Sequence, residues 1–268
     1  MKIGLAGSKG FIGTELKKIL NDEKYQFCEF DFDLRKKENF KSAATIDIMV
    51  LLASVTPSEN VENNPHFFLQ NNYNITINVL EYCRLNNVKL IFISTFLYGL
   101  NLNVPISENA KTSAETPYHF SKLICEKLCF FYHKKYLNNI IVLRPSNVYG
   151  NKKSDKNFVD HLLKGKNSDI KIFRPGDKRD FIHVSDLCQA IIKSIFNIKN
   201  MNFDIFNIGS GKSYSKYDII ACLNLDHKCE YVNLDSKITD TQYNILKAKS
   251  KLNWEPKIDL FNFLKNHE

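Results

Sequence analysis

A tyrosine and a lysine stand four residues apart in the segment Tyr118-His-Phe-Ser-Lys122. On an α-helix this spacing puts both side chains on one face. A free phenol, with a pKa of about 10, is a poor base at neutral pH, but a nearby ammonium group favours the phenolate. The pair could therefore work as an acid/base, with Tyr118 exchanging a proton and Lys122 supporting it.

The same spacing of tyrosine and lysine occurs at residues 149–153 and 243–247, so the surroundings decide which pair is used. Pro117 comes directly before Tyr118, and proline is well suited to the first turn of a helix. Of the other two pairs, one ends a strand-like segment and the other lies far along the chain. We therefore predict that the pair at Tyr118 and Lys122 does the chemistry.

Two hydroxyl residues, Ser94 and Thr95, come at the end of a predicted strand over residues 88–94, upstream of Tyr118. Ligands of open parallel sheets bind at the carboxyl ends of the strands. A hydroxyl at this place could hold the oxygen whose proton Tyr118 exchanges. The sequence leaves open whether Ser94 or Thr95 takes this role.

Three glycines in Gly7-Ser-Lys-Gly10-Phe-Ile-Gly13 lie between a predicted strand over residues 2–6 and a predicted helix over residues 14–21. Such glycines permit a tight turn, close approach of the backbone to a pyrophosphate, and close packing of helix on strand. The helix N-terminus adds N–H groups and a positive dipole. The turn therefore predicts dinucleotide binding. Its predicted contacts are Gly7, Lys9, Gly10, Phe11, Ile12 and Gly13.

Asp31 ends the second predicted strand, 18 residues beyond Gly13. An acid at this distance hydrogen-bonds the 2′-hydroxyl of the adenosine ribose and favours NAD. Lys9 and the basic run over residues 35–37 could instead neutralise a 2′-phosphate. The cofactor is therefore NAD or NADP, and the sequence does not decide between them.

The elements that must position these residues alternate between strand and helix over about 145 residues. The predicted strands cover residues 2–6, 25–31, 46–53, 88–94 and 139–143, and the predicted helices cover residues 14–21, 65–86 and 117–137. Such βαβ alternation is typical of an α/β fold. It predicts a Rossmann-like, doubly wound parallel sheet.

After Gly150 the alternation becomes irregular, which indicates a second, smaller domain. We assign residues 1–150 to the dinucleotide-binding Rossmann domain and expect the segment of about 178–208 to return to it. Residues 151–177 and 209–268 would then form a small, discontinuous substrate-binding lobe.

The composition excludes several classes of protein. The chain has 268 residues, of which 44% are hydrophobic and 25% charged, as expected of a globular protein. Its longest apolar run, residues 48–53, is too short to span a bilayer, and no signal peptide is recognisable. We expect a cytoplasmic protein that does not associate with membranes.

The net charge of +8 comes almost entirely from lysine. A basic chain can bind nucleic acid, but we interpret this excess mainly as a solvated surface and expect no nucleic acid partner. The seven cysteines form no Cys-x-x-Cys pair, and the histidines form no His-Glu-x-x-His motif. We therefore expect reduced thiols and no metal site.

Taken in order along the chain, these motifs resemble those of the extended short-chain dehydrogenase/reductase family, of the NAD-dependent epimerase/dehydratase type that modifies nucleotide sugars. The resemblance runs nearly from end to end. Besides the glycine turn and the Tyr118–Lys122 pair, the matching segments are residues 47–53, 72–76, 94–99, 144–150, 179–186 and 252–256.

The resemblance implies roles for individual residues. Ser94 would polarise the substrate oxygen, although the strand end also permits Thr95, while Tyr118 exchanges the proton and Lys122 supports both. The further cofactor contacts would be Asp33, Leu34, Leu52, Ala53 and Asn72. The substrate contacts would be Asn147, Arg179 and Lys237, on a nucleoside-diphosphate sugar. The family also implies a homodimer formed through the two long helices near residues 65–86 and 117–137.

Two departures from the family pattern narrow the reaction. The 4,6-dehydratases carry an Asp-Glu pair where this chain has Thr95 and Phe96, so elimination of water lacks its acid/base. The connection between Asp31 and Asp47 is short, as in the sugar ketoreductases. The resemblance therefore implies hydride transfer at a sugar carbon, by a 4-ketoreductase or a 4-epimerase. The alternative is a non-catalytic dinucleotide-sensing or RNA-binding protein of the same fold.

Overall fold

The computed structural model describes residues 1–57, 64–99, 103–150, 157–164, 170–232 and 238–266. The chain forms two compact units, each built from several segments. Unit 1 consists of Met1–Leu97, Thr112–Arg144 and Cys188–Phe206, and unit 2 consists of Tyr98–Lys111, Pro145–Leu187 and Asn207–Glu268.

Unit 1 is built on a six-stranded sheet with the strand order β2-β1-β3-β4-β5-β9. The strands are β1 (Ile3–Ala6), β2 (Phe27–Glu29), β3 (Ile48–Leu51), β4 (Lys89–Ile93), β5 (Ile140–Pro145) and β9 (Phe203–Ile208). The pairings of β1 with β2 and β3, of β3 with β4 and of β4 with β5 are parallel. The predicted α/β fold with a doubly wound parallel sheet is confirmed.

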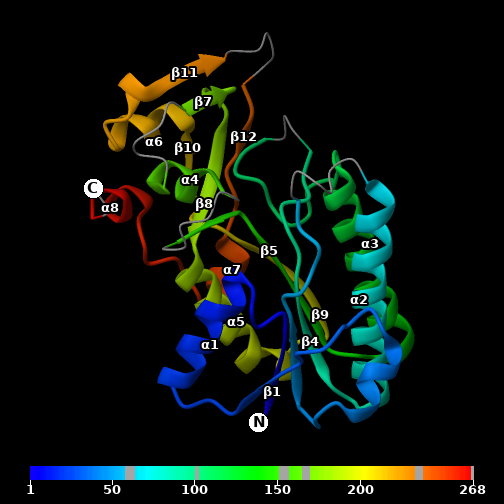
Figure 1. Ribbon diagram of the computed structural model, residues 1–268. Coiled ribbons are helices and arrows are strands. Elements are labelled where there is room, and N and C mark those ends of the chain that lie inside the picture. The colour runs from blue at the N-terminus through cyan, green and yellow to red at the C-terminus, as the bar shows by residue number, and fades with distance from the viewer. Residues whose placement is uncertain (58–63, 100–102, 151–156, 165–169, 233–237, 267–268) are drawn as a thin grey trace. The chain divides into compact units, whose positions relative to one another are not determined.

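Four helices cover the two faces of this sheet. They are α1 (Phe11–Asp22), α2 (Pro65–Leu85), α3 (Pro117–Tyr136) and α5 (Val184–Asn197). Helices α2 and α3 run side by side on one face, and α1 and α5 lie on the other (Figure 1). Two 3₁₀ helices, η1 (Lys37–Ser42) and η2 (Ile198–Asn200), complete the unit. The hydrophobic effect holds these layers together, since β1, β3 and β5 are buried along their whole length.

The sequence sets the N-termini of the two long helices. Asn64 caps α2 by accepting from the backbone N–H of Phe67, and Thr116 caps α3 by accepting from that of His119. In both helices a proline follows the cap, where its missing N–H costs nothing. These caps fix where the first turn of α3, which carries Tyr118, begins.

Several boundaries in unit 1 differ from the sequence prediction, and two of them concern predicted cofactor contacts. Helix α1 begins at Phe11, inside the glycine turn, because Gly10 is the N-cap and Thr14 already bonds the Gly10 carbonyl. Strand β2 ends at Glu29 rather than Asp31. Apolar periodicity does not reveal either change, because a cap is set by backbone geometry and not by hydropathy.

Unit 2 contains smaller sheets and shorter helices. Its strands are β6 (Asn147–Tyr149), β7 (Ile170–Phe173), β8 (Lys178–His183), β10 (Ser213–Ser215), β11 (Cys229–Val232) and β12 (Asp240–Thr241). Its helices are α4 (Phe158–Lys164), α6 (Lys216–Cys222), η3 (Asp226–Lys228), α7 (Leu246–Leu252) and α8 (Leu260–Lys265). Strand β8 is central, since β10, β12 and β6 all pair with it, while β7 and β11 pair with each other.

The buried carboxylate of Asp180 in β8 joins several segments of unit 2 by hydrogen bonds. It accepts hydrogen bonds from the backbone N–H groups of Ser210, Gly211 and Tyr243 and from the hydroxyls of Ser146 and Ser210, five in all. The residue has no exposed surface. Burial raises the pKa of Asp180 to about 6, although the backbone and hydroxyl donors favour its ionised form.

Candidate active site

The glycine turn between β1 and α1 has the geometry of a phosphate cradle. Gly7 has a φ of +97°, and a Cβ on it would lie 2.5 Å from the Ala53 nitrogen. A Cβ on Gly13 would lie 2.3 Å from the Gly7 carbonyl oxygen, which is impossible without backbone movement. Gly10 caps α1 without a side chain of its own, so a ligand can approach the helix N-terminus closely. The turn therefore fits a dinucleotide pyrophosphate.

Charged groups beside the turn occupy the region predicted for the adenosine ribose. The Lys9 ammonium lies 2.6 Å from the Asp31 carboxylate, which raises the pKa of Lys9. The Arg35 Nε lies 2.7 Å from Oδ1 of Asp33, and this contact lowers the pKa of Asp33. Lys9 and Arg35 thus each have a carboxylate partner within the protein.

The chain after β3 lies directly against the glycine turn, since Ala53 leaves no room for a Cβ on Gly7. The backbone N–H groups of Leu52 and Ala53 both donate to the Ala6 carbonyl at 2.9 Å, so this segment continues past the end of the sheet. The side-chain amide of Asn72 in α2 then binds both backbone groups of Val55. It accepts from the Val55 N–H at 2.7 Å and donates to the Val55 carbonyl at 3.2 Å. Asn72 is buried and holds this segment in place.

Tyr118 lies in the first turn of α3, and the same Asn72 reaches it. The Asn72 amide donates to the Ser121 hydroxyl at 2.8 Å, and that hydroxyl donates to the Tyr118 carbonyl at 2.7 Å. Burial raises the pKa of Tyr118, and the hydroxyls of Thr95 and Ser54 lower it in part.

The two hydroxyl residues at the end of β4 are placed differently. Ser94 continues the strand, since its N–H donates to the Leu143 carbonyl at 2.8 Å, and its side chain is buried. Among the described residues, the Ser94 hydroxyl has no hydrogen-bond partner. Successive side chains in a strand point to opposite sides, and Thr95 is the one whose hydroxyl lowers the pKa of Tyr118.

Lys122 lies one helical turn after Tyr118 and is buried. Its ammonium donates to the Ile93 carbonyl at 2.6 Å and lies 4.3 Å from the centre of the Phe92 ring. Burial lowers the pKa of Lys122, and the Glu126 carboxylate one turn further opposes this effect. Glu126 is in turn paired with Arg144, at 2.6 Å between Oε2 and Nη2.

The structure therefore brings together in unit 1 the glycine turn, the segment after β3, Thr95, Tyr118 and Lys122. Sequence reasoning missed Ser54, whose hydroxyl, like that of Thr95, lowers the pKa of Tyr118. Its position did carry a signal, because it follows a buried strand directly, where side chains of an open sheet meet ligands.

The residues predicted to contact substrate lie in unit 2. The Asn147 amide donates to the Asp180 carbonyl at 2.9 Å. The Arg179 guanidinium lies 3.2 Å from the Asp177 carboxylate and donates to the Thr239 hydroxyl at 2.7 Å, while 28% of its side chain stays exposed. Burial lowers the pKa of Arg179. Lys237 lies outside the described residues.

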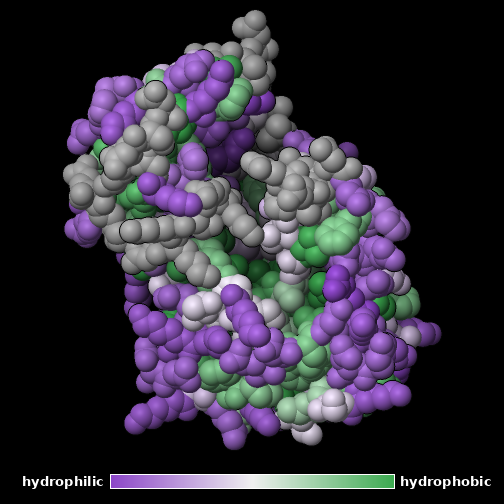
Figure 2. All heavy atoms as spheres, in the orientation of Figure 1, coloured by the Kyte–Doolittle hydropathy of each residue, from purple (hydrophilic) through white to green (hydrophobic). Residues whose placement is uncertain are grey.

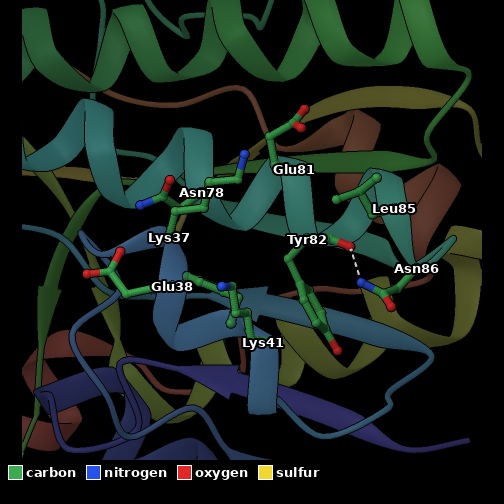
Figure 3. Close-up of a pocket in the computed structure, with 9 residues that line it drawn as sticks. Lys37, Glu38, Lys41, Asn78, Glu81, Tyr82, Leu85 and Asn86 are labelled. Atoms are coloured by element: carbon green, nitrogen blue, oxygen red, sulfur yellow. Dashed lines mark hydrogen bonds between the residues drawn. The ribbon is translucent and has the colours of Figure 1, made fainter.

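A cavity of about 380 Å³ lies between η1 and α2 (Figure 3). Its polar side chains serve the fold: Asn78 donates to the Leu34 carbonyl, Asn86 to the Tyr82 carbonyl, and Glu81 accepts from Tyr132. None of the residues predicted for the site lines it. It therefore forms no part of the candidate active site.

Two absences hold for the described part of the chain. It contains no cluster of three or more His, Cys, Asp or Glu side chains able to hold a metal ion. None of its helices combines the length and the hydropathy needed to cross a membrane.

Comparison with known proteins agrees with this geometry. The model of the NAD dependent epimerase/dehydratase family matches residues 3–209. The putative UDP-glucose 4-epimerase of Methanocaldococcus jannaschii is 30% identical, over 98% of this chain and 98% of that protein. The dTDP-4-dehydro-6-deoxyglucose reductase of Escherichia coli is 28% identical, over 92% of this chain and 81% of that protein.

Among solved structures, the UDP-glucose 4-epimerase of Stenotrophomonas maltophila, with bound NAD and formylated UDP-arabinopyranose, superposes with a TM-score of 0.90. The match covers 100% of this chain and 96% of that chain, at 19% identity, and therefore concerns the fold.

The parallel sheet, the glycine turn at its switch point and the Tyr118–Lys122 helix define a dinucleotide-dependent enzyme of the extended short-chain dehydrogenase/reductase type. Within that class, the chain belongs to the NAD dependent epimerase/dehydratase family.

Proposed function

We propose that this enzyme is an NAD-dependent 4-epimerase of a nucleoside-diphosphate sugar, with Tyr118 as its acid/base. The observation that carries the proposal is the position of Tyr118 in the first turn of α3, where Ser121 and Asn72 link its backbone carbonyl to the segment after β3. The 4-epimerase among its relatives supports this reaction. The sequence at Thr95 and Phe96, which lacks a carboxylate, disfavours elimination of water.

The residues of the chain would divide the work as follows. NAD, when bound, supplies the hydride acceptor and donor. Tyr118 takes the proton of the sugar hydroxyl as the carbon is oxidised to a ketone, and returns it when the ketone is reduced on its other face. Thr95 holds the sugar oxygen beside the phenol. Lys122 contributes a positive charge that favours the phenolate.

We assign the cofactor as NAD on the same grounds. Asp31 would accept from a ribose hydroxyl, and a 2′-phosphate would meet its negative charge. Of the cations that could offset that charge, Lys9 and Arg35 are already paired with Asp31 and Asp33. NADH should therefore bind more tightly than NADPH, as measured by calorimetry. Asp31→Ala should remove that preference, and an unchanged preference would contradict the assignment.

Unit 2 would be the substrate-binding lobe, as its residues 145–187 and 207–268 include Asn147 and Arg179. Arg179 keeps an exposed guanidinium beside Asp177, which suits exchange of that partner for a diphosphate. Arg179→Met should therefore raise KM for a nucleotide sugar by about tenfold, as for one charge-assisted hydrogen bond, and leave NAD binding unchanged.

We also propose a homodimer formed through α2 and α3. Hydrophilic residues dominate the surface over these helices, and hydrophobic residues are interspersed among them (Figure 2). Large aromatic side chains are among the exposed residues: Tyr73 on α2, and Phe120, Phe131 and Tyr136 on α3. Sedimentation should give the mass of a dimer, and Phe131→Asp should give that of a monomer.

The reaction is tested with purified enzyme and a panel of nucleoside-diphosphate sugars that includes UDP-glucose. We expect inversion at C4, seen by NMR, without accumulation of reduced nicotinamide. Stoichiometric loss of NADH with a 4-keto sugar would instead establish the second candidate, a 4-ketoreductase, which the reductase among its relatives favours. Absence of turnover with every sugar, together with salt-dependent retention of RNA, would contradict both the 4-epimerase and the 4-ketoreductase.

A further inference from the structure

The turn that joins β7 to β8 is held in place by its neighbours in unit 2. It begins at Arg174, whose N–H donates to the Val232 carbonyl of β11 at 2.9 Å. It closes where the Asp177 N–H donates back to the Arg174 carbonyl at 3.2 Å. Between these points the Pro175 carbonyl accepts from the N–H of Lys216, the first residue of α6, at 3.0 Å. The side chains of the turn therefore project from a backbone that has little freedom to move.

A buried carboxylate at the end of this turn, that of Asp177, is shared by two guanidinium groups. Arg174 makes two contacts with it, its Nε at 2.7 Å from Oδ2 and its Nη2 at 3.2 Å from Oδ1. Arg179 makes one contact, with its Nη2 at 3.2 Å from Oδ2. The Thr239 N–H also donates to Oδ1, at 3.0 Å. Arg174 is therefore the closer, two-point partner of Asp177, and Arg179 is the weaker, one-point partner.

The charged groups around Asp177 carry more positive than negative charge. The Lys216 ammonium donates to the last carbonyl of β7 at 2.6 Å, and it interacts electrostatically with Asp177 and with both arginines. A second carboxylate, that of Asp240, acts on Arg179 more weakly than Asp177 does. Three cations thus surround two carboxylates, so this part of unit 2 attracts an anion.

We propose that Arg174 is a positioning residue for the substrate diphosphate: it keeps Asp177 neutralised, so that Arg179 can leave that carboxylate and bind the diphosphate. This inference rests on the proposed role of Arg179. A buried carboxylate that loses its cationic partner is strongly destabilised, so without Arg174 the Arg179 guanidinium would stay on Asp177. With Arg174 bound to both carboxylate oxygens, the exchange leaves no unpaired charge behind.

The backbone at Arg174 agrees with a specific use of its side chain. Its φ is +49°, in the left-handed region that residues other than glycine, asparagine and aspartate rarely adopt. Glycine would adopt this conformation without strain, so the arginine stands here at a conformational cost. In return its planar guanidinium reaches both oxygens of one carboxylate, which the single ammonium group of a lysine does not match.

The first test is calorimetry on the NAD-bound enzyme with two probes, UDP and inorganic pyrophosphate. Arg174→Met should raise the Kd of both by about tenfold, because Asp177 then holds Arg179. Arg174→Lys keeps the charge without the two-point contact, so its Kd should lie between those of the wild type and Arg174→Met. It also keeps the test usable where Arg174→Met fails to fold. Unchanged Kd values in both variants, or a wild type that binds neither probe, would overturn the proposal.

The matched control removes a different cation of unit 2. Lys249 is an exposed lysine that pairs with Glu255 at 3.4 Å. Lys249→Met therefore changes the net charge as Arg174→Met does, and it should leave both Kd values unchanged. An equal rise of Kd in Lys249→Met would show that net charge alone acts on the probes, and would overturn the proposal.

The second test removes the carboxylate that Arg174 is proposed to neutralise. Adding Asp177→Asn to Arg174→Met should bring the Kd of both probes back to within about threefold of the wild type, because no negative charge then holds Arg179. Asparagine keeps an oxygen that can accept from the Thr239 N–H. A double variant that binds more weakly than Arg174→Met would overturn the proposal, since that result indicates a purely structural cluster.

Turnover of UDP-glucose separates this proposal from the proposed function. Arg174→Met should raise KM by about tenfold and leave kcat unchanged, because the diphosphate is bound equally in the ground state and the transition state. A fall of kcat at unchanged KM would overturn the proposal. Absence of wild-type turnover would instead count against the proposed function, and the binding of pyrophosphate would still decide the role of Arg174.

Discussion

Two ionisable groups, Tyr118 in unit 1 and Asp180 in unit 2, are surrounded in opposite ways. Asp180 accepts five hydrogen bonds from fixed backbone and hydroxyl donors and has no exposed surface. Tyr118 is only partly buried, and the side-chain hydroxyls of Thr95 and Ser54 lower its pKa in part. Asp180 is therefore saturated by the fold, whereas Tyr118 keeps the capacity to pass a proton to another molecule.

The difference teaches how to separate a structural group from a reactive one. Burial raises the pKa of both. The shift alone does not tell them apart, because structural networks perturb pKa values as well. What separates them is whether the partners are fixed donors of the backbone or side chains at a strand end beside an open cradle.

The largest expected effect comes from removing the saturated group. Asp180→Ala leaves the N–H groups of Ser210, Gly211 and Tyr243, of which that of Tyr243 is buried, without their acceptor, and each buried loss costs about 1–3 kcal/mol. We expect the free energy of unfolding to fall by about 3 kcal/mol or more. Urea unfolding followed by Trp254 fluorescence measures it, because Trp254 is the only tryptophan of the chain and lies buried in unit 2.

The exposed Asp22 serves as the control for this substitution. Asp22→Ala should change the free energy of unfolding by no more than about 0.5 kcal/mol. If Asp180→Ala were equally mild, the distinction between a saturated and a reactive group would fail.

A middle-sized effect concerns the two hydroxyl residues at the end of β4. Thr95→Val removes the hydroxyl proposed to hold the sugar oxygen, and we expect kcat to fall by about 10–100-fold, as for loss of a hydrogen bond to a developing charge. Ser94→Ala removes a buried hydroxyl without a partner among the described residues and should lower kcat less. Steady-state kinetics compare the loss of kcat in the two variants. A larger loss in Ser94→Ala than in Thr95→Val would assign the catalytic hydroxyl to Ser94.

The smallest effect is a pH dependence of stability that arises from Asp180. Its pKa is about 6 in the folded state, above that of an unfolded aspartate, so the folded state binds more protons between about pH 4 and 6. Stability contributed by this group should therefore fall as the pH rises through that window, by at most about 1.4 kcal/mol per pH unit. Asp180→Asn should lack this slope in urea titrations, and an identical slope would assign it to other groups.

Much of the fold could be predicted from the sequence. The apolar runs of the strands, the capped prolines before α2 and α3, and the glycine turn are local signals, so the order of elements followed from them. The boundaries were less visible, because Gly10 begins α1 by its backbone geometry. The division of the chain between the two units was not visible either. Residues 98–111 belong to unit 2 because they contact residues far away in the sequence.

The site could be predicted in part, for the same reason. The Tyr118–Lys122 spacing and the glycine turn are recognisable from short segments of the sequence. The hydrogen bonds that run from Val55 through Asn72 and Ser121 to the Tyr118 carbonyl join residues far apart in the chain, and no local pattern reveals them. The choice between Ser94 and Thr95 depends on which side of the sheet each faces where β4 ends, and the residue types leave that open.

The most direct test of the central claim is the turnover of Tyr118→Phe, which removes one oxygen atom and keeps the ring. We predict that kcat falls by about 10²–10⁴-fold, while NAD affinity and the free energy of unfolding stay close to the wild-type values. Steady-state kinetics on the sugar nucleotide turned over by the wild type, with calorimetry and urea unfolding, measure all three. Turnover by Tyr118→Phe at the wild-type rate would contradict the assignment of Tyr118 as the acid/base.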